Sequence, residues 1–140
     1  MDEFAVHRDA IRHLLARYTY NGDRGRVAEL AACFTADGVL EYPGASPVGP
    51  EAIAVSLSSG TRNPELKFVR HHITNPLINL DGDTATARSY FAVHCNIGPD
   101  HSGTYDDQLV RTTDGWRFSR RRVRIDWQAE NSLFRPMTNR

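Results

Sequence analysis

The order in which helical and strand-forming segments follow one another along the chain constrains its fold most. Up to Gly60, apolar side chains recur largely at helical spacing, whereas residues 67–127 are rich in β-branched and aromatic residues that short turns interrupt. Strands joined by short turns, with no helix between them, pair as neighbours in an antiparallel sheet. Helices first and strands afterwards is the α+β arrangement. The sequence therefore predicts three N-terminal helices packed on one curved antiparallel sheet.

The three helices can be placed from their apolar spacing and from their end signals. A helix is expected from about Glu3 to Tyr20, where Asn21-Gly22 ends the pattern, and a second helix over residues 27–34. A short strand over residues 38–42 comes next. The third helix begins at Pro50, because proline is favoured at the first helical position.

Five further strands are expected over residues 67–73, 76–80, 84–96, 103–112 and 116–127. Turn signals separate them, among them Asn75-Pro76 and Gly98-Pro99-Asp100. A strongly curved sheet with helices against one face forms a cone-shaped barrel that encloses one apolar pocket. We expect a single domain over residues 1–140, with a core of about residues 5–128 and an irregular tail over 129–140.

Charge and composition exclude several classes of protein. Seventeen Lys and Arg residues balance seventeen Asp and Glu residues, so nothing electrostatic favours nucleic acid or an anionic membrane as partner. No apolar run approaches the roughly 18–20 residues of a membrane span, and the N-terminus lacks the features of a signal peptide, so a cytoplasmic chain is expected. Cys33 and Cys95 are too few for a disulfide framework or a thiolate metal site, and we expect them to be buried.

The sequence also lacks the common catalytic motifs. It contains no GxGxxG, P-loop, GxSxG or HExxH pattern, so a bound nucleotide, a serine nucleophile and a zincin-type metal site all lose support. Histidines on the predicted strands are the remaining candidates. His71 and His72 point to opposite faces of their strand, so at most one faces the pocket, and both could simply lie at the surface. His94 alternates with apolar residues, which is compatible with a side chain facing water or with one lining the pocket.

Three further polar residues stand out. Tyr18 lies on the apolar stripe of the first helix, so its hydroxyl group is carried inward and needs a partner. Asp23 follows the Asn-Gly break, where a cap of the second helix is the simpler interpretation. Arg121 shares a strand face with Ile125 and Trp127, while the neighbouring arginines face solvent. An inward arginine needs an anion or a carbonyl oxygen beside it.

Three segments of the chain together resemble a known family. Residues 11–42, 69–93 and 103–123 resemble, in their order and spacing, the SnoaL-like branch of the nuclear transport factor 2-like superfamily. The resemblance runs over most of the chain, from about Ile11 to Trp127. It implies a cone-shaped α+β barrel that commonly forms a homodimer through the outer face of its sheet.

The resemblance also implies roles for individual residues. Scytalone dehydratase, bile-acid 7α-dehydratase and hexachlorocyclohexane dehydrochlorinase carry an aspartate–histidine pair in the cone, and Asp23 and His71 match that pair. Tyr18 matches a tyrosine of the bile-acid enzyme, and Arg121 lies near an arginine that two of these enzymes place in the pocket. His94 falls where one of them has an aspartate and another a second histidine, which leaves the substrate open.

These residues would support proton transfer without a cofactor or a metal ion. Asp23 would fix the tautomer of His71, which then acts as a general base worth about 10²- to 10⁴-fold in rate. Tyr18 or His94 would donate to a departing hydroxyl group, and Arg121 would stabilise the enolate-like charge. We therefore expect a cofactor-independent lyase of the dehydratase type, acting on a small, largely apolar cyclic, polyketide-like or steroid-like substrate.

Two alternatives remain at this stage. An isomerase or an aldol-type cyclase would need the same base and would differ only in whether a leaving group departs. A binding module without catalysis, or the small subunit of a ring-hydroxylating oxygenase, predicts instead that Asp23 and His71 are not hydrogen-bonded and that the pocket is filled by its own side chains.

Overall fold

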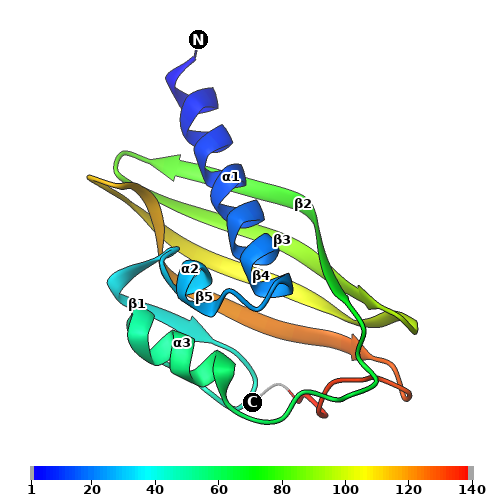
Figure 1. Ribbon diagram of the computed structural model, residues 1–140. Helices are drawn as coiled ribbons and strands as arrows, with labels where there is room; N and C mark the ends of the chain where they lie inside the picture. The colour runs from blue at the N-terminus through cyan, green and yellow to red at the C-terminus, as the bar shows by residue number, and fades with distance from the viewer. Residues whose placement is uncertain (1, 139–140) are drawn as a thin grey trace.

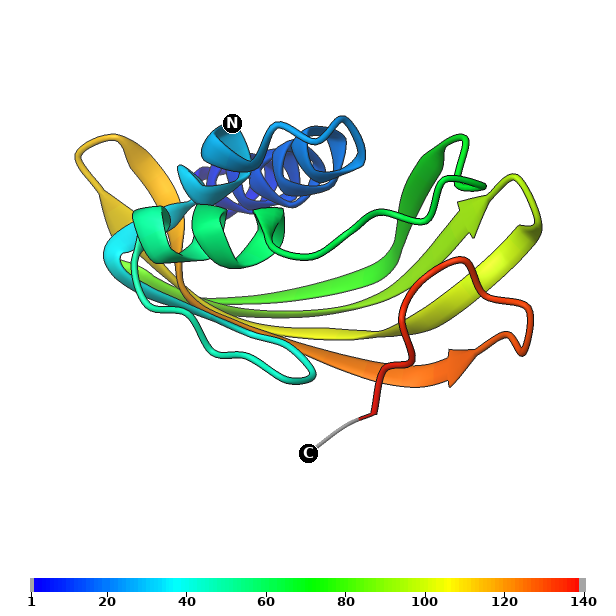
Figure 2. The same ribbon diagram turned by 60° about the horizontal axis from the view of Figure 1, so that its bottom comes forward.

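Three helices lie on the concave face of one curved, open sheet in the computed structural model, which describes residues 2–138 (Figures 1 and 2). The helices are α1 (Glu3–Asp23), α2 (Val27–Ala31) and α3 (Pro50–Ser58). The strands are β1 (Phe34–Glu41), β2 (Val69–Asp81), β3 (Thr84–Cys95), β4 (Gly98–Thr112) and β5 (Gly115–Gln128). Their order in the sheet is β1-β5-β4-β3-β2. The predicted α+β fold is confirmed.

The sheet is a meander with one exception. Strands β2 to β5 pair antiparallel with their sequence neighbours, as predicted. Strand β1 instead pairs parallel with β5, because α3 and the long β2–β3–β4 excursion separate the two in sequence. Phe34, expected at the end of the second helix, opens β1, where its ring lies 5.3 Å from that of Phe118 in the core.

The Asn21-Gly22 pair does not end α1, contrary to the prediction. The Asn21 amide donates to the carbonyl oxygen of Arg17 within the helix at 2.9 Å, so the helix runs on. Gly22 allows α1 and α2 to approach, because a Cβ atom there would lie 3.1 Å from the Leu30 side chain. Asp23 is therefore the last residue of α1, and the N-cap of α2 is Arg26.

Two segments predicted as turns lie inside strands. Asn75-Pro76 falls within β2, where the pairing with β3 shifts between Thr74 and Leu77 and Asn75 adopts a φ of 55°. This irregularity accommodates a proline, which cannot donate a hydrogen bond to the neighbouring strand. Gly98-Pro99-Asp100 begins β4, because residues 96–97 form the turn.

A bulge in β5 reverses the predicted orientation of Trp127. Ile125 pairs with Gly103, but Trp127 pairs with the residue directly before Gly103, so Asp126 is an extra residue in β5. Trp127 therefore lies on the outer face with half of its surface exposed, while Ile125 is buried. Gly103 is required at this point, since a Cβ atom would lie 1.8 Å from the carbonyl oxygen of Arg124.

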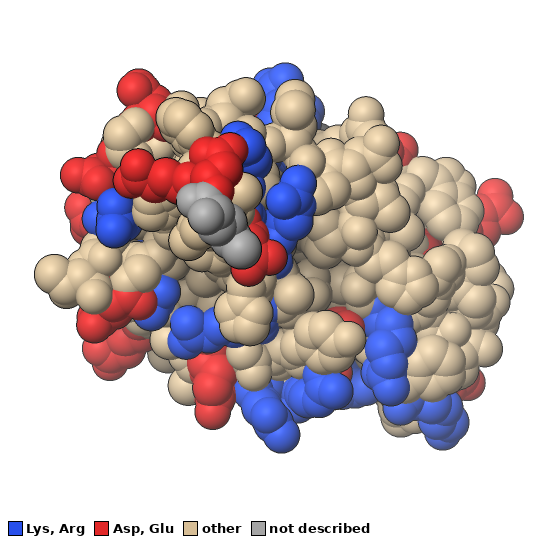
Figure 3. All heavy atoms as spheres, turned by 90° about the horizontal axis from the view of Figure 1, so that it is seen from above, with Lys and Arg blue, Asp and Glu red and all other residues tan. Residues whose placement is uncertain are grey.

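The surface carries both signs of charge. In the face shown in Figure 3, acidic side chains gather at the left and basic ones lie along the lower edge, while uncharged side chains cover most of the right half. No single sign dominates this face. None of the helices in residues 2–138 has the length and apolar character that crossing a lipid bilayer requires.

The tail after β5 is irregular over residues 129–138, but it is anchored. Residues 129–138 form no helix or strand, and Asn139 and Arg140 lie outside the described residues. The Gln128 amide nitrogen donates to the carbonyl oxygen of Arg135 at 3.0 Å, and its amide oxygen accepts from the backbone N–H of Met137 at 2.9 Å. One side chain thus holds two points of the tail.

An ion pair lies in the middle of the core. Arg121 donates two hydrogen bonds to Asp107, at 2.8 and 2.9 Å, and both side chains are fully buried. The guanidinium carbon lies 4.3, 3.8 and 4.3 Å from the ring centres of Tyr18, Tyr105 and Phe118. Burial alone would lower the pKa of Arg121, but the Asp107 carboxylate raises it above its ordinary value. The predicted inward arginine is therefore a charged part of the core.

Removal of Asp107 should destabilise the protein severely, because it leaves a buried guanidinium group without a counter-ion. For Asp107→Ala we expect the free energy of unfolding, measured by urea denaturation, to fall by about 3–5 kcal/mol. Asp106→Ala is the matched control, since Asp106 pairs with Arg88 at the surface at 3.5 Å. The control should lose less than about 1 kcal/mol. Equal losses in the two variants would contradict a structural role for the buried pair.

Candidate functional site

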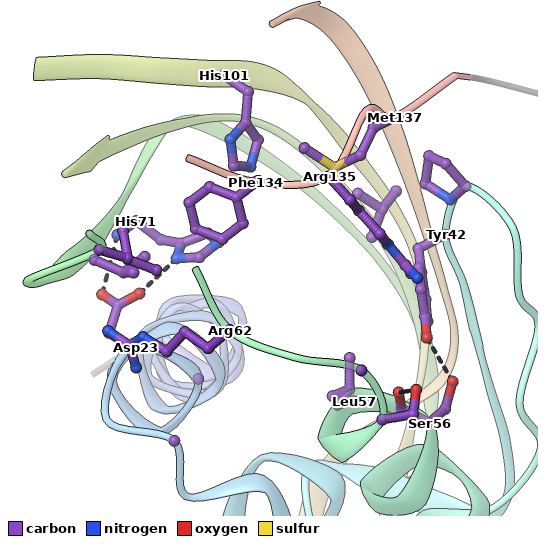
Figure 4. A pocket seen from close by; sticks show the side chains of 18 of the residues that line it. Asp23, Tyr42, Ser56, Leu57, Arg62, His71, His101, Phe134, Arg135 and Met137 are labelled. Atoms are coloured by element: carbon purple, nitrogen blue, oxygen red, sulfur yellow. Dashed lines mark hydrogen bonds and ion pairs between the residues drawn. The ribbon is translucent and has the colours of Figure 1, made fainter. Parts of the chain in front are cut away.

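A cavity of about 550 Å³ lies between the helices, the concave face of the sheet and the tail (Figure 4). Its volume is in the range of small-molecule sites, roughly 300–1,000 Å³. Much of its lining is apolar and includes Leu40, Leu57, Leu66, Val69, Phe91, Val123, Ile125, Phe134 and Met137. Two segments without regular secondary structure, residues 59–66 and 133–137, complete the lining. This cavity lies on the concave side of the sheet, where the sequence predicts a pocket.

Asp23 and His71 meet in this pocket. Oδ1 of Asp23 lies 2.5 Å from Nδ1 of His71, and Oδ2 accepts a hydrogen bond from the His71 backbone N–H at 3.0 Å. The two side chains are 8% and 24% exposed. Because a carboxylate only accepts hydrogen bonds, it holds the hydrogen of a neutral His71 ring on Nδ1 and leaves the lone pair on Nε2. This geometry suits a proton acceptor.

The extension of α1 beyond the predicted break is what brings this pair together. Asp23 is the last residue of α1. The hydrogen bond from the His71 backbone N–H to the Asp23 carboxylate joins this end of the helix to the beginning of β2. Had the helix stopped at Tyr20, a loop would carry the carboxylate instead of a rigid element.

His72 and His94 lie together on the outer face of the sheet. Their ring centres are 4.8 Å apart, and neither residue is among those that line the pocket. The inward side chains of β3 are Phe91, Val93 and Cys95, so the alternation of the strand turns His94 outward. The structure therefore does not bring His94 to Asp23 and His71, contrary to its expected role in the pocket.

Tyr18 lines the pocket, and Arg121 lies behind it. Burial raises the pKa of Tyr18 to about 12, although Arg121 acts in the opposite direction. Tyr18 therefore keeps its proton at neutral pH and can donate a hydrogen bond. Arg121 is absent from the pocket lining that residues 2–138 form, and its charge is balanced by Asp107. The expected direct contact between Arg121 and a substrate is not available in this arrangement.

His101 is a pocket residue that the sequence analysis missed. Its Nδ1 lies 2.7 Å from Oδ1 of Asp100, whose side chain is fully buried. Asp100 also accepts hydrogen bonds from the Ser132 hydroxyl at 2.7 Å and from the backbone N–H of Leu133 at 2.8 Å. The carboxylate thus ties His101 to the tail. The Gly-Pro signal before Asp100 concealed this pair, because it placed residues 98–100 in a turn.

The charge states of Asp100 and His101 follow from their surroundings. Burial alone would raise the pKa of Asp100, but hydrogen bonds from His101, Ser132 and Leu133 lower it below its ordinary value. Burial lowers the pKa of His101, against the effect of the Asp100 carboxylate. At neutral pH the carboxylate is charged and the imidazole is neutral, so its lone pair lies on Nε2.

The described residues offer little to a metal ion. In residues 2–138 no three His, Cys, Asp or Glu side chains are grouped closely enough to hold one. Cys33 and Cys95 are buried free thiols, as predicted.

Stability should fall in acid because of His101 and Asp100. Since the pKa of His101 is lower in the folded chain, the unfolded chain binds the proton more readily, and stability falls as the pH drops below about 6.5. Asp100 adds a further loss as the pH falls from its ordinary pKa near 3.8 through its lowered value. We expect His101→Gln to reduce the loss between about pH 7 and pH 5.

Urea denaturation at a series of pH values measures this dependence. His72→Gln is the matched control, because His72 is exposed on the same sheet. The same loss between pH 7 and pH 5 in His101→Gln and in the wild type would show that another group causes it.

Comparison with known proteins agrees with this fold. Residues 5–122 match the model of the SnoaL-like domain. Rv3472 of Mycobacterium tuberculosis, a protein of unknown function, is 30% identical, with a TM-score of 0.78 over 96% of this chain and 80% of that one. An NTF2-like protein with a cystatin-like fold from Novosphingobium aromaticivorans is 26% identical, with a TM-score of 0.79 over 94% and 91% of the two chains.

One further structure bears on the fold alone. A "Putative Scytalone Dehydratase" from Novosphingobium aromaticivorans has a TM-score of 0.80 over 96% of this chain and 93% of that one, at 24% identity. The family match spans most of the chain, and the helices, the curved sheet and the pocket agree with it. The chain therefore belongs to the SnoaL-like family of the nuclear transport factor 2-like superfamily.

Proposed function

We propose that this protein is a cofactor-independent lyase that removes water from a small, largely apolar cyclic or polyketide-like molecule. The observation that carries the proposal is the Asp23–His71 pair in the pocket, with Nδ1 of His71 held at 2.5 Å. A carboxylate in this position orients the imidazole and stabilises the imidazolium that forms when Nε2 takes a proton.

The reaction needs only groups of this chain. Nε2 of His71 removes a proton from the carbon beside a carbonyl group, and Asp23 stabilises the resulting imidazolium. Tyr18 donates a hydrogen bond to the carbonyl oxygen as negative charge develops there. The electron pair then forms a carbon–carbon double bond and hydroxide leaves the next carbon. The hydroxide ion takes the proton from Nε2 of His71, so that water departs and the base is restored.

His101 supplies a second contact for the substrate. Its neutral ring, held by Asp100, presents an acceptor at Nε2 to the hydroxyl group that departs. A hydrogen bond from that hydroxyl group would hold the leaving group in the pocket before the reaction begins.

Two features favour an enzyme over a binding module. The Asp23–His71 hydrogen bonds are present and the cavity of about 550 Å³ is open, whereas neither was expected of a binding module. An isomerase or an aldol-type cyclase would use the same base, and only the products separate these reactions from dehydration.

Variants of the pair test the proposal. The bicyclic β-hydroxy ketone 3-hydroxy-1-tetralone loses water to give 1-naphthol, which can be followed by absorbance. We expect His71→Ala and Asp23→Asn each to lower kcat by about 10²- to 10⁴-fold, because each removes the oriented base. His72→Ala is the matched control on the opposite face of β2 and should leave kcat unchanged.

The outcomes separate the candidate functions. Exchange of the proton beside the carbonyl group for solvent deuterium, without loss of water, would favour the isomerase. Turnover in His71→Ala equal to that of the wild type would rule out His71 as the base.

We also propose that two copies of the chain pair through the outer face of the sheet. Leu77, Tyr90 and Trp127 lie exposed on that face, at 61%, 57% and 50% of their surface. Exposed apolar side chains that gather on one face are typical of interaction sites.

A charge in this face should separate the dimer, because it would be buried without a partner. We expect Tyr90→Glu to give a monomer in sedimentation velocity experiments, whereas Val55→Glu on the exposed side of α3 should leave the dimer intact. A monomeric wild type at micromolar concentration would refute the pairing.

A further inference from the structure

The charges that line the pocket do not balance. Besides the two histidines, its charged lining residues are Asp23, Arg62 and Arg135, and Asp23 is already bonded twice to His71. Among residues 2–138, neither of these arginines lies within 4.0 Å of a carboxylate, and neither guanidinium group donates a hydrogen bond. A mostly apolar cavity lined by one more cation than carboxylates, with neither arginine in an ion pair, favours an anionic ligand.

Arg135 stands on a segment whose backbone is held by hydrogen bonds to two side chains. Gln128 donates to the Arg135 carbonyl oxygen at 3.0 Å, and Asp100 accepts from the backbone N–H of Leu133 two residues earlier. Figure 4 shows the Arg135 side chain extending across the pocket toward Tyr42. The backbone is thus held in place while the guanidinium group stays hydrated, so it can exchange water for an anion at little cost.

A pair of hydroxyl groups lies on the same side of the pocket. The oxygen atoms of Tyr42 and Ser56 are 2.5 Å apart, and both residues are half-buried in the lining. One hydroxyl group donates to the other, which leaves the second hydrogen available to a ligand. Figure 4 places this pair and Arg135 on one side of the pocket and Asp23 and His71 on the other.

We infer that Arg135, together with Tyr42 and Ser56, binds an oxyanion of the substrate. The substrate is then a largely apolar molecule with a carboxylate or phosphate group at the end far from the bond that reacts. Apolar side chains of the lining, such as Phe134 between the two sides and Leu57 beside Ser56, cover its body. The inference depends on the proposed function in one respect, namely that the reacting end of the substrate lies at Asp23 and His71.

Two sources share this chemistry. The oxyanion is either a carboxylate of the substrate itself or a phosphate of a carrier to which the substrate is joined, such as coenzyme A. Both accept the paired hydrogen bonds that a guanidinium group and a hydroxyl group donate.

Calorimetric titration with decanoate and 1-decanol tests the subsite, since the two probes differ in charge at one end. We expect the wild type to bind decanoate with a Kd at least about tenfold lower than that of 1-decanol, because the carboxylate accepts a charge-assisted hydrogen bond. Arg135→Gln should abolish this preference and leave the Kd of 1-decanol unchanged, and Tyr42→Phe should reduce it. The preference should also weaken with added salt.

Arg62→Gln is the matched control, because Arg62 lines the same pocket on the side of Asp23. It should keep most of the preference for decanoate. An equal Kd for decanoate in the wild type and Arg135→Gln, or an equal loss in Arg62→Gln, would overturn the inference.

Coenzyme A, titrated alone, distinguishes the two sources. Binding that depends on Arg135 identifies a carrier phosphate, whereas Arg135-dependent binding of decanoate only identifies a free acid. If neither probe binds, there is no such subsite. Asp23→Asn should bind decanoate as the wild type does, so failure of the catalytic proposal and failure of this one give different results.

Discussion

The buried Arg121–Asp107 pair is the interaction on which the rest of the pocket depends. The two residues lie directly opposite each other on β5 and β4, and the guanidinium group contacts the ring of Tyr18 from α1. A planar cation between aromatic rings accepts few arrangements, so it determines where α1 crosses the sheet. Asp23 follows five residues later, about 7.5 Å along the helix axis. The Arg121–Asp107 pair thus determines where the Asp23 carboxylate reaches β2.

Two aspartates join the elements around the pocket through the same kind of hydrogen bonds. Asp23 holds a ring nitrogen and a backbone N–H of His71, which joins α1 to β2. Asp100 holds the ring nitrogen of His101 and the backbone N–H of Leu133, which joins β4 to the tail. In each case one carboxylate accepts hydrogen bonds from a histidine ring and from a partly buried backbone N–H group. The connection between the elements and the orientation of each imidazole therefore depend on the same hydrogen bonds. Loss of either carboxylate weakens the connection and frees the ring that it held.

The sequence predicts those parts of this arrangement that depend on local spacing. Alternation along β5 indicates that Arg121 turns inward, but its partner on β4 carries no local mark. The predicted orientation of Trp127 is wrong because a bulge adds one residue to β5. The position of this bulge depends on Gly103 of the neighbouring strand. His101 escapes notice because Pro99 is typical of a turn. Asp23 and His71 are 48 residues apart, so a resemblance rather than any spacing pairs them.

The pocket is built differently at its two sides, and this has a consequence for specificity. The imidazoles and Asp23 stand on α1, β2 and β4, whose core contacts tolerate little change. Arg62 and Arg135 stand on segments without regular structure, and their exposed side chains lie outside the core, so either can be substituted without disturbing the core packing. If Asp23 and His71 transfer protons as proposed, a chain of this kind keeps those groups while the groups that recognise the far end of the substrate change. One kind of base on one fold would then serve many substrates.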